Sequence, residues 1–153
     1  MLKKLQDLRL FTGVTTFLVL VTAAAICQSP NYAVDGVAVN GYDVVAYFID
    51  GKPVKGSAEF AFTLDSVQWL FSSREHLDLF KSDPERYLPQ FGGWCAYGVS
   101  QNYKAPTEPD AWTIVNDKLY LNYNKKVRKM WLQDRDARIH TAEQNWTELK
   151  HKE

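Results

Sequence analysis

Apolar side chains occupy every second position in two neighbouring stretches near the middle of the chain, Phe60–Leu64 and Val67–Phe71. A period of two is typical of a β-strand that buries one face. The intervening Asp65-Ser66 predicts a tight turn, because both residue types are common in turns. We therefore expect a β-hairpin here, and the rest of the domain is built around it.

A short helix is predicted directly after this hairpin. Ser72 lies three residues before Glu75, the spacing of a capping box. Leu77 and Phe80 give the helix a narrow apolar side. The dipeptide Asp83-Pro84 predicts the end of this helix and the cap of a further turn.

The preceding segments favour strands separated by turns. Val34–Val39 predicts a brief strand, and Tyr42–Ile49 is rich in β-formers and strongly apolar, so we expect a second strand there. Turns are predicted at Asn40-Gly41 and Asp50-Gly51.

Further along the chain, Gly92-Gly93 predicts the start of a helix that places Cys95 in its first turn. A second hairpin is predicted from Trp112–Val115 and Lys118–Tyr123. Its turn is Asn116-Asp117, a dipeptide suited to positive φ angles.

Two helices are predicted at the C-terminal end. Asn124 can cap the first, in which Val127 and Trp131 share one face. The second places four apolar residues on one side, Ile139, Ala142, Trp146 and Leu149. Strands and helices do not alternate as βαβ units, so we expect an α+β fold. It is a small single domain with two β-hairpins packed against short helices and a C-terminal helical segment.

The first residues predict a targeting segment. Basic residues precede an apolar run of about 13 residues, Val14–Ile26, which ends in small side chains. A membrane-spanning helix needs about 20 apolar residues. The pattern indicates a signal peptide or N-terminal anchor over residues 1–25.

We therefore expect a periplasmic or secreted protein with one domain over residues 34–150. Contact with a membrane is expected only through an uncleaved signal or a lipidated Cys27. The chain carries 18 basic and 18 acidic residues, so its formal net charge is zero. No basic excess marks a nucleic-acid surface, and we expect no nucleic-acid partner.

Cys95 is the sharpest candidate for chemistry. At the first turn of a helix, the helix dipole lowers the pKa of a thiol and favours the thiolate, which reacts and binds metals. The alternative is a small buried side chain that only packs. If Cys27 is removed or lipidated, Cys95 is left as an odd thiol.

His76 and Asp43 are further candidates. Histidine suits zinc or copper, but one imidazole does not make a site, and we expect His76 to be largely exposed on its helix. Asp43 lies beside a turn, where hydrogen bonding to the local backbone is the ordinary role. The chain contains none of the common hydrolase, metalloprotease or nucleotide-binding motifs, so we do not expect an enzyme.

Read together, five segments resemble the YHS-domain family, in particular its exported bacterial members of similar length. These segments are Asn40–Phe48, Phe71–Ser73, Asp83–Tyr87, Gly92–Tyr97 and Leu119–Val127. The resemblance therefore implies that this chain is a small exported domain. The wider superfamily resembles TRASH-type modules, whose cysteines bind transition or heavy metals.

The resemblance also implies where metal ligands would stand. The cysteines of the metal-binding relatives fall here at Ser72, at His76 and near Ala46. Only His76 keeps a side chain that can bind a borderline metal. Apart from the resemblance, we expect a Cys/His site for copper or zinc in which Cys95 approaches His76, completed by Asp43 or by a partner.

Three hypotheses follow. The first is an exported protein that binds or handles copper or zinc through Cys95 and His76. The alternative is a non-catalytic module that binds a ligand or an unspecified protein without a metal. A third is a thiol-redox role for Cys95, which lacks a resolving cysteine unless Cys27 persists.

Overall fold

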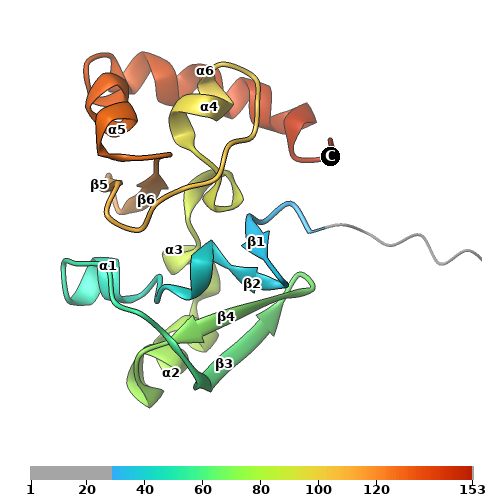
Figure 1. The fold of residues 1–153 in the computed structure, drawn as a ribbon, viewed down its shortest axis with the longest axis vertical. Helices are drawn as coiled ribbons and strands as arrows, with labels where there is room; N and C mark the ends of the chain where they lie inside the picture. Colours follow the sequence, from blue (N-terminus) through green and yellow to red (C-terminus); the bar gives the residue numbers. More distant parts are fainter. Residues whose placement is uncertain (1–28, 153) are drawn as a thin grey trace, which may run out of the picture.

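The computed structural model describes residues 29–152 and has an α+β fold, as the sequence predicts (Figure 1). The predicted signal or anchor over residues 1–25 and Cys27 lie outside the described residues. No helix in the described part of the chain is long and apolar enough to cross a membrane.

The elements follow one another in two groups. The first comprises β1 (Ala33–Val34), β2 (Val37–Ala38), η1 (Val39–Gly41), α1 (Ala46–Ile49), β3 (Ser57–Leu64), β4 (Val67–Phe71), α2 (Arg74–Ser82) and α3 (Pro84–Tyr87). The second comprises η2 (Gln90–Gly93), α4 (Ala96–Ser100), β5 (Trp112–Val115), β6 (Lys118–Leu121), α5 (Lys125–Leu132) and α6 (Arg135–Leu149).

The first group is built on a sheet with the strand order β1-β2-β4-β3. The predicted hairpin is confirmed: β3 and β4 pair antiparallel with Leu64 opposite Val67, and both residues of the turn have positive φ. The inward side chains of β4 pack on α2, where the rings of Trp69 and Phe71 lie 5.8 and 4.9 Å from that of Phe80. This aromatic cluster fixes α2 against the sheet.

The second group encloses another apolar core. The hairpin β5–β6 is confirmed, and α4, α5 and α6 gather beside it (Figure 1). Trp131 is fully buried and contacts Tyr120, with ring centroids 5.4 Å apart. The predicted helix cap is also confirmed, because the Asn124 side chain accepts the Val127 N–H at 2.9 Å. In α6, Ala142 and Leu149 are buried as the predicted face requires.

Polar contacts link the two groups. The hydroxyl of Tyr47 donates to the Pro109 carbonyl at 3.0 Å, and Asn40 Nδ2 donates to the Thr107 carbonyl at 2.8 Å. The loop after α4 is thereby tied to the α1 region, so the two cores form parts of one domain.

The strand predicted over Tyr42–Ile49 is wrong. The chain makes a single β-bridge at Tyr42 and then turns into α1. Val44, Val45 and Ala46 are all buried. The apolar run therefore reflects burial on every side, which a short helix satisfies as well as a strand does.

Two further elements differ from expectation. The segment Val34–Val39 forms the two short strands β1 and β2 with a turn between them, instead of one strand. Gly92-Gly93 ends η2, and Trp94 follows in an extended conformation. Cys95 is consequently the N-cap of the five-residue α4 and precedes its first turn.

Candidate functional site

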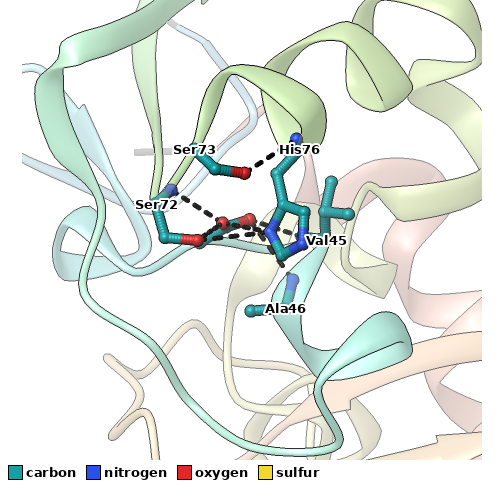
Figure 2. Close-up of polar contacts among 6 residues, drawn as sticks. Val45, Ala46, Ser72, Ser73 and His76 are labelled. Carbon is teal, nitrogen blue, oxygen red and sulfur yellow. Dashed lines mark hydrogen bonds and ion pairs between the residues drawn. The ribbon is translucent and has the colours of Figure 1, made fainter.

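The carboxylate of Asp43 is fully buried and accepts hydrogen bonds from Val45, Ala46, Ser72 and His76, which are labelled in Figure 2. Its Oδ1 accepts backbone hydrogen bonds from Val45 at 2.9 Å and Ala46 at 3.3 Å. Its Oδ2 accepts from the backbone N–H of Ser72 at 2.8 Å, from the Ser72 hydroxyl at 2.6 Å and from His76 Nδ1 at 2.7 Å. Five donors thus satisfy one buried charge, the condition under which a carboxylate can be enclosed.

The cluster joins three elements. Asp43 lies three residues before α1, Ser72 follows β4, and His76 lies in the first turn of α2. The helix cap predicted at Ser72 is wrong, because Ser73 is the N-cap and its hydroxyl accepts the His76 N–H at 3.1 Å. Ser72 is one position too early for that role, and its side chain turns inward to Asp43. The predicted hydrogen bonding of Asp43 to its local backbone is confirmed for Oδ1. Its Oδ2 also binds Ser72 and His76, which are distant in the chain.

His76 was expected to be exposed, and this expectation is wrong: its relative exposure is 7%. The reason is the carboxylate, which offers the imidazole a buried partner that the helical pattern does not reveal. An ionised Asp43 can only accept, so Nδ1 carries the proton in this contact. Nε2 makes no hydrogen bond within the described residues and is not among their fully buried unpartnered atoms. In the neutral ring, this nitrogen presents a lone pair at the edge of the cluster.

The Asp43, Ser72 and His76 side chains do not form the arrangement of a serine hydrolase. In a catalytic triad, serine and carboxylate contact opposite ring nitrogens. Here the Ser72 hydroxyl lies 3.3 Å from Nδ1, the same nitrogen that meets Asp43. The serine hydroxyl donates to the carboxylate, and among the described residues no base accepts its proton.

Cys95 lies in a separate environment beside the second core. Its sulfur accepts the backbone N–H groups of Gly98 at 3.4 Å and Tyr123 at 3.2 Å. Its thiol faces Asn122 Oδ1 at 3.8 Å. These contacts enclose the residue, whose relative exposure is 1%.

The lowered thiol pKa predicted for Cys95 is contradicted. Burial raises the pKa of this thiol, and the backbone hydrogen bonds to the sulfur lower it by less than desolvation raises it. The helix that follows has only five residues, and its dipole does not offset the loss of water. The packing interpretation of Cys95 is therefore the one that fits its surroundings.

Asn122 completes the surroundings of Cys95, and no sequence pattern pointed to it. It is fully buried, and its Oδ1 accepts the Tyr97 N–H at 3.3 Å. Its position after β6 lets it bridge that strand and α4. An asparagine in a Tyr-rich strand end carries no distinctive signal, so only the packing identifies its role.

The structure therefore brings Asp43 and His76 together and leaves Cys95 with other partners. Within residues 29–152, no group of three or more His, Cys, Asp or Glu side chains is placed to hold a metal ion. Ala46, Ser72 and His76, which lie at or near the positions where the expected resemblance would place cysteines, all donate hydrogen bonds to Asp43.

Comparisons of the chain with models of known protein families, with curated proteins and with solved structures gave no match.

Proposed function

We propose that this protein is a small exported module that binds a copper or zinc ion, with His76 Nε2 as the protein ligand. The observation that carries the proposal is the 2.7 Å contact between Asp43 Oδ2 and His76 Nδ1. Metal-binding histidines commonly donate their second ring N–H to a carboxylate, which fixes the tautomer and makes the free nitrogen more basic.

Asp43 acts in this proposal as the residue that orients the ligand. All five of its hydrogen bonds would compete with direct coordination, so its oxygens are poorly suited to meet the ion. Imidazole binds both copper and zinc well. One histidine leaves the other coordination positions to water or to groups of a partner molecule, which suits transfer of an ion better than permanent storage.

The family resemblance supports the same place in the fold. The positions matched to cysteines in metal-binding relatives gather around the Asp43 carboxylate. Cys95 does not belong to this cluster, and we leave it out of the proposed ligand set.

The test is metal binding by the full mature chain without a histidine tag. Copper and zinc contents are measured after purification, and affinities are measured by calorimetry. His76→Gln is expected to abolish micromolar binding. Asp43→Asn is expected to weaken it by about 10- to 100-fold, the usual effect of losing the carboxylate behind a histidine ligand.

His140→Gln is the matched control, because this histidine on α6 is exposed and its side chain hydrogen-bonds only to Gln144 among the described residues. Cys95→Ser should also keep the affinity. Wild-type protein that binds neither metal at micromolar levels would contradict the proposal. An affinity unchanged by His76→Gln would contradict it equally.

A second candidate is a non-catalytic module that binds a ligand or protein without a metal. The burial of Cys95 favours it, since packing alone explains a cysteine whose residue exposure is 1%. The same calorimetric experiment separates the two candidates, because only the first requires His76 for binding.

A further inference from the structure

A cleft of about 370 Å³ lies where the two cores meet, and none of the residues that line it belongs to the Asp43–His76 cluster. Its apolar walls are formed by Pro30, Pro89, Phe91 and Trp146. Phe91 and Trp146 pack with the second core, whereas the adjoining Leu88 packs with the first. Cavities of this size at such a junction are common sites for small ligands.

The walls of the cleft are held by hydrogen bonds and ring packing. The carbonyl of Pro30 accepts the Trp94 indole N–H at 3.0 Å, and the carbonyl of Gly92 accepts the Tyr32 N–H at 2.8 Å. The rings of Phe91 and Trp146 meet edge to face with centroids 6.0 Å apart. The cleft is therefore formed without a ligand, which limits the entropy lost on binding.

The charge of the cleft has one sign. Glu85 from α3 and Glu143 from α6 line it, and among residues 29–152 no Lys, Arg or His does. Neither carboxylate forms an ion pair within residues 29–152. Two unpaired carboxylates beside an indole favour a cation over a neutral or anionic molecule.

We propose that this cleft binds a small organic cation, an amine with an apolar portion. The apolar portion would lie against Phe91 and Trp146, and the ammonium group would face Glu85 and Glu143. This site is independent of the metal proposal, since it shares no residue with the Asp43 cluster.

Three compounds of similar size and different charge test the proposal: phenethylammonium, phenethyl alcohol and 3-phenylpropionate. Each is titrated into the full chain labelled with ¹⁵N-tryptophan, and the indole signal of Trp146 is followed by NMR after its assignment with Trp146→Phe. The amine is expected to bind about tenfold more tightly than the alcohol, as a cation held by an aromatic face and two carboxylates should. The acid should bind most weakly.

Variants identify the carboxylates. Glu85 and Glu143 are exposed, so Glu85→Gln and Glu143→Gln should each weaken amine binding about two- to fivefold, the range for exposed ion pairs. Glu75→Gln, an exposed carboxylate on α2, is the matched control and should change nothing. His76→Gln should also leave amine binding intact, which separates this site from the metal site.

Equal affinities for the amine and the alcohol would overturn the proposal. So would two Glu→Gln variants that bind the amine as the wild type does. Absence of any Trp146 shift at about 10 mM amine would exclude even the weak millimolar range expected of a small site.

Discussion

His76 Nδ1 lies 2.7 Å from Asp43 Oδ2, although the two residues are 33 positions apart in the chain. This contact ties the first turn of α2 to the segment that begins α1. It places an ionisable pair inside the domain, where the Ser72 backbone and hydroxyl complete the polar shell. The following predictions concern this cluster and the other unusual positions of the fold.

Asp43→Asn should destabilise the domain by about 2–4 kcal/mol, because removing one member of a buried charged network leaves its donors unsatisfied. An amide keeps the size of the side chain but turns an NH₂ group toward donors. Urea denaturation followed by circular dichroism measures the loss. Asp78→Asn on the exposed face of α2 is the control and should stay within about 0.5 kcal/mol of the wild type. Equal stabilities of the two variants would contradict the role assigned to Asp43.

The two adjacent serines should differ in what they support. Ser73→Ala removes the N-cap of α2 and should cost about 1 kcal/mol. Ser72→Ala removes a hydroxyl that donates to Asp43 and should cost a similar amount, about 1–2 kcal/mol. The variants are distinguished by a double-mutant cycle with Asp43→Asn, which should show coupling for Ser72 and much weaker coupling for Ser73. Strong coupling of Ser73 alone would reverse the assignment.

The Cys95 thiol should be unreactive in the folded protein. Burial raises its pKa and closes access to the sulfur. Alkylation by iodoacetamide at pH 8 should be at least about 100-fold slower in native protein than in urea-unfolded protein, because it requires an opening of the fold. Comparable rates in the two states would show that the sulfur is accessible.

The same raised pKa predicts a pH dependence of stability. The unfolded thiol ionises near pH 8.5, whereas the folded thiol ionises at a higher pH. The contribution of the neutral thiol is therefore fully present below about pH 8.5. It is lost as the pH rises from there through the folded pKa, because ionisation favours the unfolded chain. Cys95→Ala should remove this part of the alkaline decline, and an identical decline in both proteins would contradict the prediction.

Gly92→Ala should destabilise the domain by about 1–3 kcal/mol. Gly92 has φ of +61°, and a Cβ added there would lie 2.5 Å from the Pro30 carbonyl oxygen. Both the conformation and the contact therefore oppose a side chain. Gly51→Ala is the matched control, since its φ is also positive but no atom lies within 4 Å of the added Cβ. If the two variants lose equal stability, the close approach to Pro30 has no cost of its own.

The hairpins and helix faces could be predicted from the sequence because their signals are local. Alternation in Val67–Phe71 and the turn at Asn116-Asp117 each involve neighbours in the chain, and the structure keeps them. The Asn124 cap was predictable for the same reason. In contrast, the apolar run Tyr42–Ile49 was misread because full burial removes the periodicity that separates a helix from a strand.

The candidate site was predictable only as a set of residues. The sequence and its family resemblance singled out Asp43, His76 and Cys95, but spacing along the chain does not report distances through space. The burial of His76 depends on a carboxylate that approaches from another element. The raised pKa of Cys95 depends on the residues packed around its sulfur. Their burial of the thiol raises its pKa by more than the dipole of the five-residue α4 can lower it.

By itself, the sequence determined the α+β class, the two hairpins and the order of the main helices, because each rests on side-chain periods and turn residues within a few positions. The tertiary structure alone decided that Asp43 meets His76, that Cys95 stands apart from them, and that Glu85 and Glu143 share a cleft. These relationships arise when α1, β4, α2 and α6 pack, and the burial of polar groups then depends on partners that lie far away in the chain.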